Sequence, residues 1–228
     1  MKRIAMGVSL GILAFTGAKV WLGASAVAAE KKAEAANAPT MSATDLRNGM
    51  RKLWTEHVFW TRNFIISAVA GLPDQPAVTE RLLRNQDDLG GAIKPLYGEE
   101  AGKKLSTLLR DHILIAAEIV KAAKGKDTKG VEAGQKKWRG NADDIATFLS
   151  SANPQWTKPA LTDMLYKHLD LTTAEVVARL KMDWPADIKA ADAGYDHMLM
   201  FADMLSDGLV KQFPKKFASS QTEPQHLN

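Results

Sequence analysis

The 228-residue sequence contains no cysteine. A chain without thiols forms no disulfide bond, binds no zinc ion or iron–sulfur cluster through thiolates, attaches no haem c covalently and has no cysteine nucleophile. Aromatic residues make up only 7% of the chain, whereas 46% of its residues are hydrophobic and 25% are charged. This balance is typical of a globular protein rather than of a disordered or fibrous one.

The usual motifs of several enzyme classes are also missing. The sequence lacks the paired Glu-x-x-His motifs of ferritin-like di-iron bundles, the His-Glu-x-x-His motif of zinc metalloproteases, the Gly-x-Gly-x-x-Gly fingerprint and the phosphate-binding P-loop. Ser67, Ser106 and Ser206 lack the nucleophile-elbow signature, and we expect them to pack between helices. The sequence therefore indicates no particular reaction.

The first 29 residues predict an export signal. Lys2 and Arg3 precede an apolar stretch over 4–18, and small residues follow over 24–29, which is the order of a secretory signal peptide. A retained membrane anchor is the alternative, but Lys19 interrupts the run, which is shorter than the roughly 20 apolar residues of a membrane span. We expect cleavage after residue 29, no stable membrane span afterwards, and a periplasmic or secreted location in a bacterium.

The charge left after cleavage argues against two kinds of partner. Loss of residues 1–29 removes Lys2, Arg3 and Lys19 but no acidic residue, so the formal net charge falls from +4 to +1. A nearly neutral protein has no general attraction for nucleic acid or for an anionic membrane surface. We therefore expect no nucleic-acid partner, while a small ligand or a metal ion stays possible and the oligomeric state is open.

From Ser42 onward the sequence predicts an all-α fold. Apolar residues recur at intervals of three and four, and no run alternates with period two for long enough to predict a strand. Thr157 is expected to begin one helix, and a capping box formed by Thr172 and Glu175 to begin another. The expected helices cover 43–70, 77–93, 99–124, 128–151, 158–170, 173–183 and 186–212. The expected organisation is a signal peptide over 1–29, a spacer over 30–42, a single helical domain over 43–217 and a flexible tail over 218–228.

An internal repeat is the most informative feature of the sequence. The run Asn85–Leu89 (NQDDL) returns 56 residues later at 141–145 (NADDI), and His112 returns at His168 with the same offset. A weaker third copy begins at His57, and each of the three histidines precedes an asparagine or aspartate by 28 or 29 residues. We therefore expect a bundle of about six to seven helices built from two or three repeated helical hairpins.

Parts of the chain resemble an uncharacterised family of bacterial helical proteins. The resemblance rests on the stretch Leu53–Arg62 (LWTEHVFWTR), the repeated asparagine–aspartate motifs, His197–Met200 (HMLM) and Lys211–Pro214 (KQFP), and it extends from about Leu46 to Phe217. It implies a helical fold, and it implies no activity, cofactor or catalytic residue.

Three histidines are the main candidates for chemistry, because each lies on the apolar stripe of its expected helix and should point inward. A buried imidazole needs partners for both nitrogens, and the following Asn/Asp helix offers amides and carboxylates. One interpretation is a repeated hydrogen bond between helices. The other is a site for a divalent metal ion such as zinc, iron or manganese. The candidate ligands are His57, His112, His168, Asn85, Asp88, Asn141 and Asp144.

The last expected helix has two further features. Asp192, Asp196, Asp203 and Asp207 form one acidic strip, which we expect to be solvated, although it could also line a polar cavity or meet a basic partner. On the opposite face His197, Met200 and Met204 form a set of soft ligands that would suit copper, a less favoured metal here because methionine is far more common in cores than on metals.

Three classes of function are compatible with these features. The first is an exported bundle that binds a metal ion or small ligand through its buried His, Asn and Asp groups. The second is a structural or partner-binding module without chemistry, and the third is a periplasmic enzyme that uses a histidine–carboxylate pair.

Overall fold

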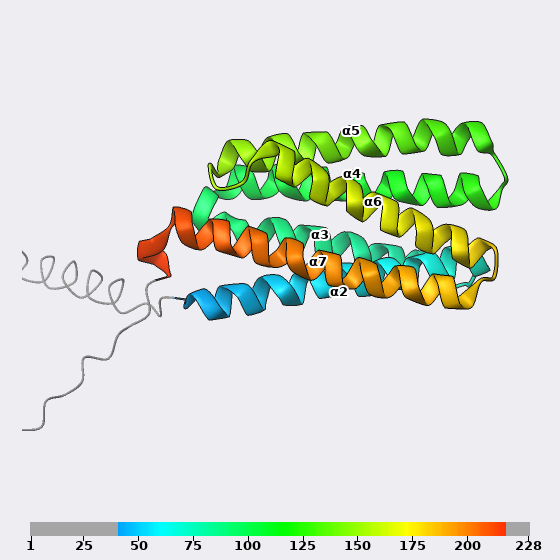
Figure 1. Ribbon diagram of the computed structural model, residues 1–228, viewed down its shortest axis with the longest axis horizontal. Helices are drawn as coiled ribbons and strands as arrows, with labels where there is room; N and C mark the ends of the chain where they lie inside the picture. The colour runs from blue at the N-terminus through cyan, green and yellow to red at the C-terminus, as the bar shows by residue number, and fades with distance from the viewer. Residues whose placement is uncertain (1–40, 218–228) are drawn as a thin grey trace, which may run out of the picture. The chain divides into compact units, whose positions relative to one another are not determined.

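The computed structural model describes residues 41–217. The expected signal peptide, most of the spacer and the expected tail lie outside this range. The described part contains six α-helices and one short 3₁₀ helix, η1, and no strand (Figure 1). The helices are α2 (Ala43–Ala70), α3 (Gln75–Tyr97), α4 (Glu99–Lys124), α5 (Thr128–Ala152), α6 (Lys158–Leu180) and α7 (Trp184–Gln212), followed by η1 (Pro214–Lys216).

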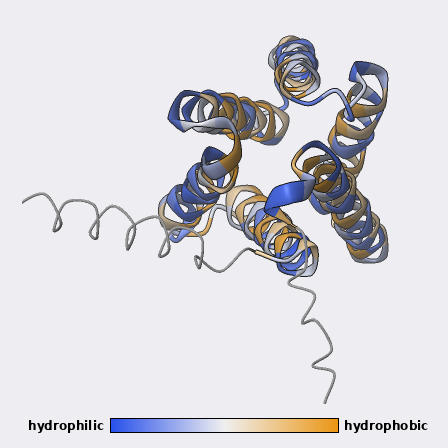
Figure 2. Cartoon of the chain, turned by 90° about the vertical axis from the view of Figure 1, so that its left-hand side faces the viewer, coloured by the Kyte–Doolittle hydropathy of each residue, from blue (hydrophilic) through white to orange (hydrophobic). Residues whose placement is uncertain are grey.

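The six helices form a closed bundle, which confirms the predicted all-α helical bundle for the described residues. Each helix packs against the next one along the chain, and α7 packs back against α2. Viewed end-on, the helices surround a common interior (Figure 2). Helix α2 also contacts α4 and α6. The three helices that carry His57, His112 and His168 therefore approach one another inside the ring.

Local signals explain several helix ends. Ser42 and Asp45 form a capping box at the start of α2, with the Asp45 N–H donating to Ser42 Oγ at 3.0 Å. Thr157 caps α6 as expected, by accepting a hydrogen bond from the Ala160 N–H. Helix α3 begins two residues before its expected range, with Pro76 in its first turn, where a missing N–H costs little. It continues past its expected end although Pro95, inside its last turn, removes one backbone hydrogen bond.

One expected boundary is wrong. Thr172 and Glu175 do not cap a new helix, because α6 runs without a break from Lys158 to Leu180. Leu169 and Val176, on either side of the expected break, are both buried. Two threonines lower helix propensity by only a few tenths of a kcal/mol each, which is less than the cost of exposing either apolar side chain.

Helices α3 and α4 approach closely at two glycines. A Cβ atom on Gly90 would lie 2.5 Å from the Gly102 carbonyl oxygen, whereas a Cβ atom on the adjacent Gly91 would meet nothing within 4 Å. We expect Gly91→Ala to raise the free energy of unfolding by about 0.5–1 kcal/mol, because alanine favours the helix. Gly90→Ala is expected to lower it by about 1–3 kcal/mol through overpacking. Urea denaturation of the two variants tests the close contact, and an equal gain in both would contradict it.

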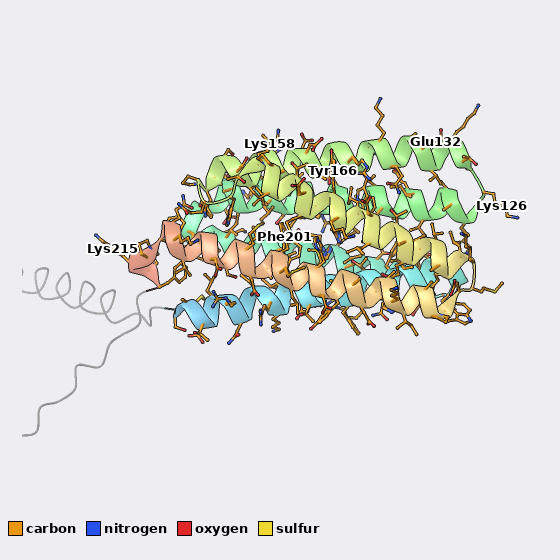
Figure 3. The ribbon with its side chains drawn as sticks, viewed as in Figure 1. Lys126, Glu132, Lys158, Tyr166, Phe201 and Lys215 are labelled. Carbon is orange, nitrogen blue, oxygen red and sulfur yellow. The ribbon has the colours of Figure 1, made fainter. Side chains whose placement is uncertain are left out.

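The interior contains two apolar clusters. The larger includes Trp54, Leu109, Leu165 and Phe201, and the smaller includes Ile65 with seven other residues from α2, α3, α4 and α6. Phe201 lies among the side chains between the helices, whereas charged side chains such as those of Lys126 and Glu132 extend outward (Figure 3). None of the helices in residues 41–217 is long and apolar enough to cross a membrane.

Ion pairs join α7 to α2. Asp203 accepts a hydrogen bond of 2.7 Å from Arg51 Nε, and Asp207 pairs with Arg47. Asp192 and Asp196, the other members of the acidic strip, are exposed and form no ion pair with any residue in 41–217. Half of the strip therefore contacts a basic neighbour within the chain, and the other half is solvated as expected.

Candidate functional site

Three histidine side chains from three alternate helices meet in the interior. The ring centroid of His168 lies 5.6 Å from that of His57 and 5.8 Å from that of His112. All three side chains are buried: His57 is 3% exposed, His112 4% and His168 7%. We call these three side chains the histidine centre. Its existence agrees with the prediction that each histidine points inward.

The three rings are neutral at pH 7. Burial lowers the pKa of His57 to about 3, with a further contribution from the neighbouring His112, and burial lowers the pKa of His112 to about 4. Burial and then the surrounding histidines bring the pKa of His168 well below its ordinary value. Because a neutral imidazole has one N–H and one lone pair, each ring can donate one hydrogen bond and accept one.

The partner of His112 is Asn141, one of the two residues, with Asp144, that the sequence offered. His112 Nδ1 lies 2.8 Å from Asn141 Oδ1, and Asn141 Nδ2 donates to the Leu108 carbonyl at 3.0 Å. A carbonyl oxygen only accepts, so the amide nitrogen of Asn141 faces Leu108 and its oxygen faces His112. The proton of His112 is therefore on Nδ1, and Nε2 has a free lone pair. In residues 41–217 that lone pair has no hydrogen-bond donor.

The partner of His57 is Gln86 and not the expected Asn85 or Asp88. Gln86 Nε2 lies 3.4 Å from His57 Nδ1 and also donates to the Leu82 carbonyl and to Asn85 Oδ1. These two oxygen acceptors fix the amide orientation and take up its two N–H groups, so the 3.4 Å contact with His57 Nδ1 is a weak, shared one. Because His57 Nδ1 faces an NH2 group and not an acceptor, the proton of His57 is on Nε2. A spacing of 29 residues, which also separates His112 from Asn141, was the signal in the sequence that could have identified Gln86.

A second contact recurs in each pair of helices. Asn85 donates to the Leu53 carbonyl, Asn141 to the Leu108 carbonyl and His197 Nε2 to the Met164 carbonyl, at 3.1, 3.0 and 2.8 Å. In every case the acceptor is the carbonyl four residues before the histidine of the centre. His197 thus takes the place that asparagine has in the other two pairs. His197 is buried and bonded to the Met164 carbonyl, whereas Met200 is 57% exposed, so these two expected copper ligands do not lie together.

The other expected metal ligands do not join the histidines. Asp88 and Asp144 are exposed on the outer surface, although each lies only three residues from a buried asparagine. The ring planes of His112 and His168 are nearly parallel, at 22°, so their in-plane lone pairs do not converge on one point. Within residues 41–217 no group of three or more His, Asp or Glu side chains is arranged to hold a metal ion. The metal site stays a prediction.

A narrow crevice between α2, α6 and α7 reaches His168 from the surface. It has a volume of about 10 Å³ and is lined by Thr61, His168, Glu175, Ala191 and Gly194, among others. Thr61 Oγ1 is buried there without a hydrogen-bond partner in the described part of the chain. Neither ring nitrogen of His168 has such a partner either. The crevice therefore contains one buried hydroxyl oxygen and one imidazole ring that form no side-chain hydrogen bond within residues 41–217.

A broader groove adjoins the crevice on the seam between α2 and α7. It has a volume of about 320 Å³, and Val58 and Ala191 line both hollows. Phe59, Ile188 and Tyr195 are exposed around the groove. By contrast, the cavity inside the larger apolar cluster has a volume of only about 30 Å³. A small organic molecule fits the groove but not this cavity.

Four charged side chains beside the crevice form a buried network that sequence reasoning missed. Arg62 donates to Glu175 at 2.7 Å and to both oxygens of Asp187, and Arg179 donates to Asp187 at 2.8 Å. Burial raises the pKa of Glu175. Burial acts in the same direction on Asp187, but hydrogen bonds from Arg62 and Arg179 outweigh it and lower the net pKa. The two positive and two negative charges compensate one another.

Comparison of the chain with protein-family models, curated proteins and solved structures finds no match. The resemblance to a bacterial helical family accordingly stays a prediction. The fold and the site together define a class of protein. It is a closed all-α bundle with a neutral histidine centre, and a crevice leads from the surface to this centre.

Proposed function

We propose that this protein binds a small ligand at the histidine centre, through the crevice and groove between α2, α6 and α7. The observation that carries the proposal is His168, a buried ring between two other buried rings with neither nitrogen hydrogen-bonded in the described residues. Thr61 Oγ1, in the same crevice, is a fully buried polar atom without a partner among residues 41–217. Such an atom costs about 1–3 kcal/mol, which favours an occupant that completes its hydrogen bond and those of the adjacent ring.

The size of the hollows limits the ligand. The crevice admits only a group about as large as one water molecule or one ion, whereas the adjoining groove accommodates the rest of a small molecule. A divalent ion such as zinc, iron or manganese is the alternative occupant of the crevice, and it would require the His112 and His168 rings to turn so that their lone pairs converge.

We further propose that the bundle consists of three copies of one helical hairpin, α2–α3, α4–α5 and α6–α7. The recurring contact from Asn85, Asn141 and His197 to a carbonyl four residues before a histidine supports this. These bonds also support a structural module as a second candidate function, because they join helices whether or not a ligand binds. We place the protein in the periplasm or outside the cell, as the N-terminal sequence predicts.

Gly194 offers a test of ligand binding. It lines the crevice, and a Cβ atom there would meet nothing within 4 Å, so leucine is accommodated while it closes the crevice mouth. Gly49 on α2 is exposed and equally open, which makes Gly49→Leu a matched control. Protein purified without added ions is examined by native mass spectrometry and elemental analysis. We expect a bound species in the wild type and in Gly49→Leu that Gly194→Leu lacks.

Two further measurements make the proposal refutable. Thermal unfolding of each protein is followed with and without zinc or manganese, because a ligand of the folded state raises the unfolding temperature. A wild type that carries no bound species and unfolds at one temperature under all these conditions contradicts ligand binding and favours the structural module. Bound zinc, iron or manganese would identify the ion as the occupant.

A further inference from the structure

The groove between α2 and α7 has a definite chemical character. Exposed rings of Phe59 and Tyr195 line it, at 56% and 39% exposure, together with the apolar Ile188. Ala191 also lines the groove, where a larger side chain would fill part of the hollow. The faces of aromatic rings carry partial negative charge and attract cations. The shape therefore suits a compact apolar group, and the rings favour a positively charged one.

The charges around the groove also favour a positively charged ligand. Arg62 lines it, but its guanidinium group is bound by Glu175 and Asp187. Arg51, farther along the seam, is bound by Asp203. Asp192 also lines the groove and is exposed, and it has neither an ion pair nor a side-chain hydrogen bond with any residue in 41–217. One uncompensated negative charge thus lies beside two exposed aromatic rings.

We propose that this groove binds the alkylammonium group of a small organic cation. Asp192 supplies the opposite charge, and Phe59 and Tyr195 supply aromatic contact with the ammonium group and its methyl or methylene substituents. This inference rests on the proposed function, because it names the chemical class of the small ligand that binds between α2, α6 and α7. The uncharged His168 in the adjoining crevice does not repel such a ligand and can accept a hydrogen bond from a hydroxyl or N–H group that reaches it.

Choline and its neutral carbon isostere, 3,3-dimethylbutan-1-ol, test the charge requirement, because the two molecules share one shape. Binding of each to the purified protein is measured by isothermal titration calorimetry and by ligand-observed NMR. We expect choline to bind at least about tenfold more tightly than the isostere, with an affinity that falls as salt is added. Equal binding of the two molecules, or no binding of either, overturns the proposal.

Substitutions locate the site. Asp192→Asn keeps the shape of the side chain and removes its charge, and we expect it to weaken choline binding about two- to fivefold. Asp196→Asn is the matched control, because Asp196 is also exposed on α7 but does not line the groove. Phe59→Leu keeps an apolar surface without the aromatic face, and we expect about threefold weaker binding. An equal loss in Asp192→Asn and Asp196→Asn would show nonspecific attraction and overturn the assignment.

The outcomes separate this inference from the proposed function. A bound species that disappears in Gly194→Leu, combined with no preference for choline over its isostere, leaves ligand binding standing and refutes the organic cation. Choline binding that depends on Asp192 but is unchanged in Gly194→Leu supports the groove and refutes the role of the crevice. Ammonium and ethanolamine, titrated in the same way, show whether the methyl groups contribute to binding.

Discussion

Acidification from pH 7 to pH 5 is expected to lower the free energy of unfolding by several kcal/mol. The pKa of His57 is lowered to about 3 and that of His112 to about 4, and the pKa of His168 is also well below its ordinary value of 6.5. Below pH 6.5 the unfolded chain therefore binds more protons than the folded one. The stability that comes from burying neutral rings is complete above pH 6.5 and is lost as the pH falls toward the folded-state pKa values.

The expected slope follows from the number of protons. Each histidine that is protonated only in the unfolded chain contributes about 1.4 kcal/mol per pH unit, so three of them contribute at most about 4 kcal/mol per unit below pH 6. The lowered pKa of Asp203 acts only below its ordinary value of 3.8. The raised pKa of Glu175 acts in the opposite sense, since protonation near pH 4.5 favours the folded chain. Urea unfolding at pH 7, 6 and 5, followed by circular dichroism, measures the slope.

The variant His112→Leu identifies the source of this pH dependence. At pH 7 it should lower the free energy of unfolding by about 1–3 kcal/mol, because Asn141 Oδ1 loses its buried partner. It should also reduce the pH slope by about one third, since one of three titrating rings is gone. Gly90→Ala is the control, because it destabilises the fold without removing a histidine and should leave the slope unchanged. A wild type equally stable at pH 7 and pH 5 would contradict the buried neutral centre.

Asp187→Asn is expected to destabilise the protein by about 2–4 kcal/mol. The carboxylate is 1% exposed and accepts hydrogen bonds from both Arg62 and Arg179, so its neutralisation leaves two guanidinium groups short of negative charge beside the core. Breaking a buried ion pair on one side typically costs about 3–5 kcal/mol, and the partial exposure of the two arginines reduces this figure.

A matched substitution on the surface calibrates this effect. Asp87 pairs with Arg110, but both side chains are at least 40% exposed, and such pairs contribute only about 0–1 kcal/mol. We expect Asp87→Asn to change the midpoint of urea unfolding only slightly, whereas Asp187→Asn shifts it strongly. Similar shifts in the two variants would mean that the network around Asp187 contributes no more than a surface ion pair does.

Local sequence signals were sufficient for most helix bounds and for the direction of the histidines. The bounds expected for 43–70 and 99–124 agree with α2 and α4, because capping residues and glycines near the helix ends are local. His57, His112 and His168 were expected to face inward because the period of the helix places them on apolar stripes. That the following Asn/Asp helix supplies the partner of His112 was expected from the repeat, since equal spacing in a hairpin brings equivalent side chains together.

Only the tertiary structure decided which groups meet. Gln86 rather than Asn85 contacts His57, and Asp88 is exposed, because one residue of helix turns a side chain by about 100° and spacing along the chain does not fix the rotation of a packed helix. The continuity of α6 was decided by burial of Leu169 and Val176, which outweighs the weak local preference of two threonines. The packing of α2 against α6 and α7 brings Thr61 to His168 and Arg62 to Asp187. These pairs are more than 100 positions apart, and no local pattern carries that information.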